Sequence, residues 1–135
     1  INPNQQQFLQ NYWPGPLTAI LPFKGGLANE LNLKGSSIAF RMTSSPVAKS
    51  LIKLTGVPLV GTSANLSSEK ENAEFAETKK IFGDQVDLYI DGGKTPGGKP
   101  STIVDLTRPE TYNVIREGSI TLKKDELKIL FGRNP

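Results

Sequence analysis

The sequence predicts an α/β fold in which helices flank a mixed parallel and antiparallel sheet. Apolar runs of strand length alternate with helix-like segments through the middle of the chain. The last two strand-like runs, 102–106 and 113–116, are too close for a helical crossover, so we expect them to pair antiparallel. With 135 residues, the chain is long enough to form one hydrophobic core. We therefore expect residues 1–135 to belong to a single domain.

The first quarter of the chain predicts a helix, a strand and a loop. A helix is expected over 4–13 and must end there, because Pro14 and Pro16 cannot continue helical backbone. The dense apolar run 17–23 has strand length. The polar, glycine-containing segment 24–35 then predicts a loop.

Next come a second strand and a helix with clear end signals. The alternation of apolar and other residues over 37–41 indicates a strand. Ser45 and Pro46 suit the N-cap and the first position of a helix that continues to about residue 54. Gly56 suits a left-handed C-terminal cap, so we expect the helix to end there.

The remaining elements complete the alternation. The apolar run 57–62 predicts a short buried strand, and the run 86–90 predicts a further strand. Between them, Asn72 is expected to cap a helix over 73–82, and a final helix is expected over 123–131.

Composition excludes several kinds of site. The chain has no Cys and no His, which excludes disulfides, thiolate chemistry and imidazole catalysis within these residues. The formal net charge of +3 and the pI near 9.2 favour anionic ligands. No apolar run approaches the ~20 residues that a membrane-spanning helix needs. We expect a cytoplasmic protein that does not enter a membrane.

Segments rich in small polar residues adjoin the expected strands at 61–65, 97–102 and 116–119. In open α/β sheets, ligands bind beyond the carboxyl ends of strands, and glycine-rich turns can form anion-binding nests. Arg41 and Arg116 have side chains suited to two-pronged contact with a carboxylate or phosphate. Ordinary turn, helix-cap and surface roles stay open for all of these residues, because no Walker A or G-x-G-x-x-G motif is present.

Five ordered motifs resemble those of the Sua5/YrdC/YwlC family. They cover nearly the whole chain and are NYWPGPLTAIL at 11–21, PLVGTSANLS at 58–67, VDLYIDGG at 86–93, GKPSTIVDLT at 98–107 and IREGSI at 115–120. The resemblance implies a twisted mixed sheet with helices on both faces and a positively charged, concave cleft.

The resemblance also implies a reaction. L-threonine and bicarbonate combine, and the resulting carboxylate attacks ATP to give threonylcarbamoyl-AMP and pyrophosphate for t6A modification of tRNA. Such chemistry suits a chain without His or Cys, since the substrates supply their own nucleophiles and the protein aligns them. We expect Mg²⁺ to accompany ATP, held chiefly by the phosphates.

Matching the motifs position by position assigns substrate contacts but no catalytic side chain and no protein metal ligand. The positions expected to bind L-threonine are Arg41, Gly61 and Ser101. Those expected to bind ATP are Ser37, Ser63, Asn65 and Arg116. A loop-ordering role stays open for Asn65. Glu71 occupies another nucleotide-facing position, where a carboxylate suits phosphate poorly, and Asp91 and Asp105 are expected to stabilise turns.

The chain departs from the family pattern in three places. Arg41 is followed by Met-Thr-Ser-Ser-Pro, where the family commonly has x-Pro-x-His-Pro, and Ser68 replaces the usual Gly. The family's opening strand, Thr-Asp-Thr-x-Tyr-Gly-Leu segment and Lys-x-Arg stretch have no counterpart here. We therefore expect an N-terminally incomplete domain, and little activity from residues 1–135 alone.

Two other functions stay open. The first is a carbamoyltransferase of the hydrogenase-maturation type, which uses the same kind of domain on a carbamoyl adenylate. The second is a non-catalytic module that binds tRNA or double-stranded RNA. Against the second, the only adjacent basic pairs are Lys79-Lys80 and Lys123-Lys124, without interleaved aromatic residues.

Overall fold

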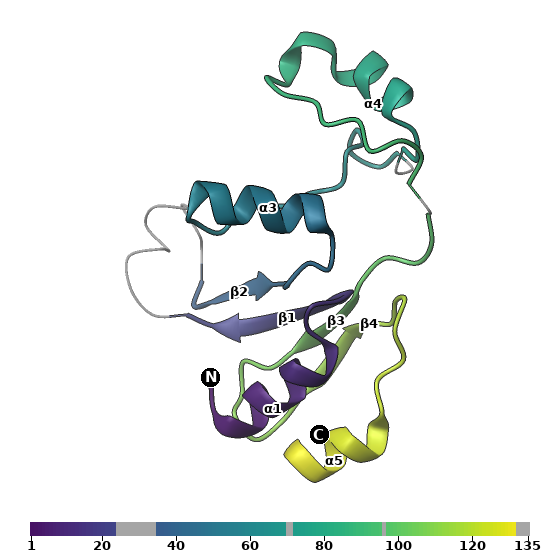
Figure 1. The fold of residues 1–135 in the computed structure, drawn as a ribbon. Coiled ribbons are helices and arrows are strands. Elements are labelled where there is room, and N and C mark those ends of the chain that lie inside the picture. Colours follow the sequence, from purple (N-terminus) through teal and green to yellow (C-terminus); the bar gives the residue numbers. More distant parts are fainter. Residues whose placement is uncertain (24–34, 70–71, 96, 132–135) are drawn as a thin grey trace. The chain divides into compact units, whose positions relative to one another are not determined.

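A computed structural model of the chain describes residues 1–23, 35–69, 72–95 and 97–131 (Figure 1). The elements in order are α1 (Pro3–Tyr12), β1 (Leu17–Pro22), β2 (Ser37–Phe40), α3 (Pro46–Thr55), α4 (Phe75–Phe82), a short 3₁₀ helix (Gly83–Gln85), β3 (Thr102–Asp105), β4 (Asn113–Arg116) and α5 (Lys124–Phe131). The loop expected over 24–35 lies outside the described residues except for Gly35.

Contacts divide the chain into two compact units. Ile1–Gly56 and Lys99–Pro135 make up the first, which we call the sheet unit, and Val57–Gly98 make up the second, which we call the α4 unit. The assignment of all 135 residues to one domain stays a prediction.

The four strands form one mixed sheet in the order β2-β1-β3-β4 (Figure 1). β1 pairs antiparallel with β2 and parallel with β3, and β3 pairs antiparallel with β4. Both the mixed sheet and the antiparallel final pair are therefore confirmed.

Register brings four strand termini to one end of this sheet. Leu17 pairs with Thr102, so the amino ends of β1 and β3 lie together. Phe40 of β2 pairs with Ala19, and Arg116 of β4 pairs with Ile103, so the carboxyl ends of those strands lie at the same end. We call this the Ser101 end of the sheet, after the residue that precedes β3.

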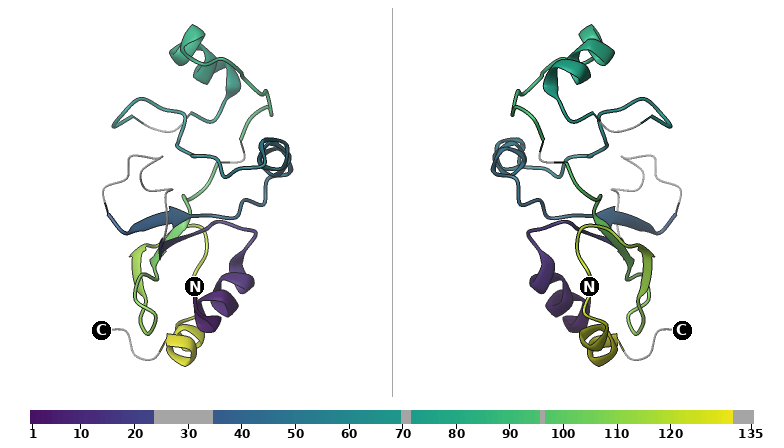
Figure 2. Two further views of the ribbon diagram at one scale, coloured as in Figure 1. Left: turned by 90° about the vertical axis from the view of Figure 1, so that its left-hand side faces the viewer. Right: turned by 90° about the vertical axis from the view of Figure 1, so that its right-hand side faces the viewer.

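One face of the sheet carries the hydrophobic core. Leu17, Ala19 and Leu21 are buried on alternate positions of β1, as the strand period of two requires. α1 and α5 lie side by side and pack against this face (Figures 1 and 2). The buried core residues are Phe8, Leu9, Leu17, Ala19, Leu21, Val104, Leu106, Tyr112, Leu122, Leu127 and Phe131.

α1 begins with a capping box. The Asn2 side chain accepts from the Gln5 amide at 2.8 Å, and the Gln5 side chain accepts from the Asn2 amide at 2.7 Å. The side-chain amide of the buried Gln5 also donates to the Leu106 carbonyl at 2.7 Å. This polar contact therefore connects the start of the helix to the end of β3.

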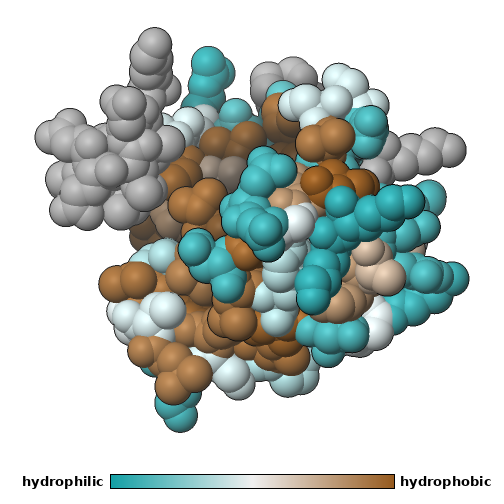
Figure 3. Space-filling view, turned by 90° about the horizontal axis from the view of Figure 1, so that it is seen from above, coloured by the Kyte–Doolittle hydropathy of each residue, from teal (hydrophilic) through white to brown (hydrophobic). Residues whose placement is uncertain are grey.

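α3 has the expected end signals but buries none of its residues. The Ser45 hydroxyl accepts from the Ala48 amide, and Gly56 adopts a left-handed conformation at φ 70°, so both predicted caps are confirmed. The helix lies on the side of the sheet away from α1 and α5 (Figure 1). Its Val47 and Leu54 are 50% and 84% exposed. Apolar side chains, in brown, also reach the surface among hydrophilic ones in Figure 3.

The α4 unit differs from the prediction. No strand forms over 57–62 or 86–90, where the apolar residues are largely exposed and pair with none of the four strands that the structure describes. α4 begins at Phe75 with Glu74 at the N-cap, so the predicted cap at Asn72 was wrong. The Asn72 side chain instead donates to the Ala64 carbonyl at 2.9 Å. An apolar run predicts a strand only when a partner strand is available to satisfy its backbone.

Candidate functional site

Four polar residues lie at the Ser101 end of the sheet. Arg41 directly follows β2, Thr18 is the second residue of β1, Ser101 directly precedes β3, and Arg116 ends β4. Because the strands lie in the order β2-β1-β3-β4, the four residues lie across the sheet in the order Arg41, Thr18, Ser101, Arg116. The sequence predicts ligand-binding loops at the carboxyl ends of strands, but Ser101 lies at the amino end of β3. The sheet is mixed, so one of its ends collects both kinds of terminus.

Ser101 is bound from both sides. Its hydroxyl oxygen lies 2.9 Å from the Thr18 hydroxyl oxygen on the neighbouring parallel strand. On the other side, Arg116 donates to the Ser101 carbonyl from Nε at 3.1 Å and from Nη2 at 2.9 Å. The same Nη2 lies 3.3 Å from the Ser101 hydroxyl. Ser101 therefore touches Arg116, although the motifs assign Ser101 to L-threonine and Arg116 to ATP.

Thr102 and Gly118 hold the segment after β4 against this strand start. The buried Thr102 hydroxyl donates to the Ile120 carbonyl at 2.6 Å and accepts from the Gly118 amide at 3.0 Å. A Cβ atom on Gly118 would collide with the Pro100 carbonyl and come within 2.5 Å of backbone atoms of Ser101 and Thr102. Only glycine fits here without backbone movement, which explains the Gly of the IREGSI motif.

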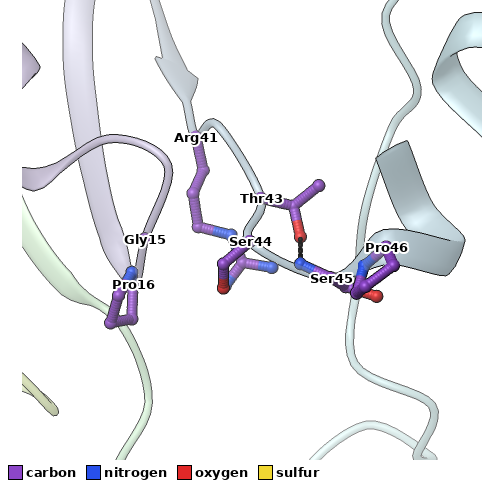
Figure 4. A pocket seen from close by; sticks show the side chains of 7 residues that line it. All are labelled: Gly15, Pro16, Arg41, Thr43, Ser44, Ser45 and Pro46. Atoms are coloured by element: carbon purple, nitrogen blue, oxygen red, sulfur yellow. Dashed lines mark hydrogen bonds between the residues drawn. The ribbon is translucent and has the colours of Figure 1, made fainter. Parts of the chain in front are cut away.

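Arg41 lines an open hollow of about 370 Å³ beside the same end of the sheet. Its side chain extends along the loop that follows β2, and Gly15 and Pro16 lie across the hollow (Figure 4). Thr43, Ser44, Ser45 and Pro46 complete the lining. The amino end of α3 therefore opens on this space together with a guanidinium group. Both favour an anion, and the two-pronged arginine suits a carboxylate.

The Trp-Pro-Gly-Pro turn fixes the other wall of the hollow. The Trp13 indole donates to the Leu17 carbonyl at 2.8 Å. The Gly15 amide donates to the Met42 carbonyl at 2.9 Å, and the Pro16 carbonyl accepts from the Thr102 amide at 3.0 Å. Gly15 is buried so closely against the Tyr12 carbonyl that a Cβ atom has no room. The turn thus connects α1, the Arg41 loop and the start of β3.

In the part of the chain that the structure describes, the two arginines at the Ser101 end have no carboxylate partner. Among the described residues, neither Arg41 nor Arg116 forms an ion pair, whereas Lys94 and Glu74 pair at 2.9 Å in the α4 unit. The two guanidinium groups are exposed. An anionic ligand would therefore meet cations that are not already neutralised by carboxylates.

Ser37 does not join this group. It begins β2 and pairs with Pro22, whereas Arg41 follows the other end of the strand. Four residues of extended chain separate the two, about 13 Å. Its assignment to ATP stays a prediction.

The other predicted contacts, Gly61, Ser63 and Asn65, lie in the α4 unit. Gly61 and Ser63 are exposed and belong to no helix or strand. The Asn65 side chain donates to the carbonyls of Leu66 and Glu69 at 3.0 and 2.8 Å, which supports the loop-ordering role. Glu71 lies outside the described residues.

Two predicted turn roles are confirmed, and two residues were missed. The Asp91 carboxylate accepts from the Gly93 amide and that of Asp105 from the Thr107 amide, both at 2.8 Å. Sequence reasoning did not single out Thr18 or Thr102. Their positions in the PLT and PST strings were the available signal, but hydroxyl contacts between strands far apart in sequence cannot be deduced from local pattern.

The described residues hold no group of three or more Asp, Glu, His or Cys side chains arranged to bind a metal ion. Within the same part of the chain, none of the helices has the length and apolar character needed to cross a membrane.

Comparison with known proteins gives concordant matches. Residues 1–118 match the Sua5/YciO/YrdC family model, whose description is "Telomere recombination". Threonylcarbamoyl-AMP synthase of Marinobacter nauticus is 34% identical over 102 residues, which are 75% of this chain and 54% of the relative. Threonylcarbamoyl-AMP synthase of Pyrococcus abyssi is 30% identical over 125 residues, which are 92% of this chain and 36% of the relative. The chain thus spans about half the length of the first relative and about a third of the second.

Solved structures agree with these matches. P. abyssi Sua5 complexed with L-threonine has a TM-score of 0.78 and 29% identity, over 98% of this chain and 38% of that one. E. coli YciO has a TM-score of 0.73 and 32% identity, over 88% of this chain and 58% of YciO. Both the family match over residues 1–118 and the mixed sheet with its ordered motifs lead to one conclusion: this chain belongs to the Sua5/YciO/YrdC family.

Proposed function

We propose that the natural protein containing this chain is an L-threonylcarbamoyladenylate synthase, a nucleotidyltransferase acting in the cytoplasm on the path to t6A in tRNA. The observation that carries the proposal is the convergence of Arg41, Ser101 and Arg116 at one end of the sheet. Relatives named threonylcarbamoyl-AMP synthase, and a Sua5 structure that holds L-threonine, support it.

In this proposal the substrates carry the reactive groups. The threonine amine forms an N–C bond with bicarbonate carbon as water leaves, and an oxygen of the resulting carbamate attacks the α-phosphorus of ATP. The bond from that phosphorus to the bridging oxygen breaks, and pyrophosphate departs. No His or Cys is required of the chain, which has neither. Its residues contribute by holding the substrates in line and by neutralising charge.

The roles of the side chains follow from their chemistry. Arg41 would pair with the threonine carboxylate in the hollow beside α3, where both the guanidinium and the helix amino end favour an anion. Ser101 would supply a hydroxyl to the same ligand. Arg116 would face the nucleotide while holding the Ser101 carbonyl.

The remaining assignments belong to the same proposal. Gly61 is assigned to L-threonine, and Ser37, Ser63 and Asn65 are assigned to ATP. Mg²⁺ would neutralise phosphate charge when bound with ATP. This ion would be held chiefly through phosphate oxygens and water. Direct binding of tRNA or double-stranded RNA stays a prediction.

The test is substrate-dependent pyrophosphate release by the full-length natural protein. We expect release from ATP to require both L-threonine and bicarbonate. Arg41→Ala should lower kcat/KM for L-threonine about 10- to 100-fold, which corresponds to losing about 1.5–3 kcal/mol of charge-assisted hydrogen bonding. Arg41→Lys should recover only part of the loss, because an ammonium cannot make the two-pronged contact.

Arg108→Ala is the matched control, since Arg108 is an exposed arginine in the β3–β4 turn at the opposite end of the sheet. It should leave kcat/KM unchanged. Pyrophosphate release that requires carbamoyl phosphate, and not threonine and bicarbonate, would show that the protein is a carbamoyltransferase. An absence of pyrophosphate release with either set of substrates would refute the synthase.

A further inference from the structure

Thr18 and Ser101 form a hydroxyl pair that joins two parallel strands. Their oxygens lie 2.9 Å apart, although 83 residues separate them in sequence. Both side chains are half-buried, and both lie on the sheet face opposite the hydrophobic core. This pair is therefore part of the Ser101 end of the sheet and not of the core.

Hydrogen bonding limits what the Ser101 hydroxyl can offer a ligand. A hydroxyl has one hydrogen to donate and two lone pairs that accept. Arg116 cannot accept, so its Nη2, at 3.3 Å, occupies one lone pair of the Ser101 oxygen. If Thr18 donates into the other lone pair, the Ser101 hydrogen remains available for a ligand oxygen. If Ser101 donates to Thr18, a lone pair remains instead and suits a ligand N–H.

We propose that Thr18 is a positioning residue for L-threonine: it donates to Ser101 and so directs the Ser101 hydrogen toward a carboxylate or carbamate oxygen of the substrate. This inference rests on the proposed synthase function. A hydroxyl that accepts from a guanidinium becomes a stronger donor, and an anionic carboxylate or carbamate accepts better than the neutral Thr18 hydroxyl, so with substrate bound the Ser101 hydrogen goes to the substrate and Thr18 donates to Ser101. Thr18 itself touches Ser101 and acts on the substrate through it.

The experiment compares Thr18→Val, Thr18→Ser and the control Thr111→Val in the full-length natural protein. Valine keeps the shape of threonine without its hydroxyl, whereas serine keeps the hydroxyl. Thr111 lies in the β3–β4 turn, at the other end of the sheet. Three quantities are measured for each: the Kd for L-threonine by calorimetry, kcat and KM for pyrophosphate release, and the thermal midpoint.

We expect Thr18→Val to raise the Kd and KM for L-threonine about 3- to 10-fold, the effect of one lost hydrogen bond, while the KM for ATP changes less than about twofold. Thr18→Ser should stay within about twofold of the wild type in all three, as should Thr111→Val.

Unchanged threonine Kd and KM in Thr18→Val would overturn the inference and leave the synthase function intact. Losses in Thr18→Ser as large as or larger than those in Thr18→Val, accompanied by a fall in thermal midpoint, would also overturn it, since serine keeps the hydroxyl and lacks only the methyl group. A wild type that neither binds L-threonine nor releases pyrophosphate would refute the proposed function, and the inference with it.

Discussion

The sheet unit and the α4 unit are stabilised in different ways. All of the buried side chains that the structure describes belong to the sheet unit, where two helices cover one face of four strands. Among the described residues of the α4 unit, none is buried. The first unit is thus held by apolar burial, and the second by local polar contacts.

The contacts of the α4 unit are individually weak. The Tyr89 hydroxyl donates to the Gly83 carbonyl at 2.7 Å, and its ring meets Phe75 edge-on at 6.0 Å. In the Lys94–Glu74 ion pair the lysine side chain is 72% exposed and the glutamate side chain 50% exposed. Solvent screens such a pair, so it contributes about 0–1 kcal/mol to stability. The predicted contacts Arg41 and Ser101 therefore lie on a firmly packed framework, whereas Ser63 lies on a more weakly stabilised one.

Removing one aromatic ring from each unit should give the largest contrast. Phe8 is fully buried, and its ring centroid lies 5.1 Å from that of Tyr12 and 5.7 Å from that of Phe131. Phe8→Ala should therefore lower the free energy of unfolding by about 3–5 kcal/mol. Phe75→Ala should cost about 1 kcal/mol or less, since that ring is partly exposed. Denaturant unfolding of the natural protein measures both, with amide exchange in β1 and β3 for Phe8→Ala and in α4 for Phe75→Ala. Similar losses in the two variants would contradict the distinction between the units.

A smaller effect is expected where two loops of the sheet unit touch. Gly118→Ala places a methyl group against the backbone of Pro100–Thr102, so the segment after β4 must move. We expect a loss of about 1–3 kcal/mol in unfolding free energy and weaker binding of L-threonine. Gly92→Ala is the control, because its added methyl group meets nothing within 4 Å. Equal thermal midpoints for the two variants would show that the close approach at Gly118 is unimportant.

The smallest effect is expected at Ser68 in the α4 unit. Ser68 has a positive φ of 71°, at the position where the family usually has Gly. A left-handed conformation costs an L-residue about 1–2 kcal/mol, and glycine's extra chain entropy costs about 0.5–1 kcal/mol. Ser68→Gly should therefore stabilise this loop by about 0.5 kcal/mol.

Amide exchange over residues 65–69 measures that change. Ser67→Gly is the matched control, since Ser67 is not among the described positive-φ residues, and it should destabilise slightly. Slower exchange in Ser67→Gly than in Ser68→Gly would contradict the strain at Ser68.

Much of the fold could be predicted because its signals are local. Ser45, Pro46 and Gly56 define α3 through capping chemistry that acts within one turn. β4 forms over Asn113–Arg116 as expected, and its antiparallel pairing follows from the short connection to β3. The failures lie at 57–62 and 86–90, where apolar composition indicated strands and the structure has none.

By itself, the sequence determined the family, the two ends of α3, the mixed sheet and the positive charge of Arg41 and Arg116, because each depends on residue type and short spacing. The tertiary structure alone decided which of these residues meet. Ser101 contacts Thr18 and Arg116 because strand register brings an amino end and a carboxyl end together. Register depends on pairing between distant segments, and so does the presence of a strand partner, which is why local pattern could not reveal either.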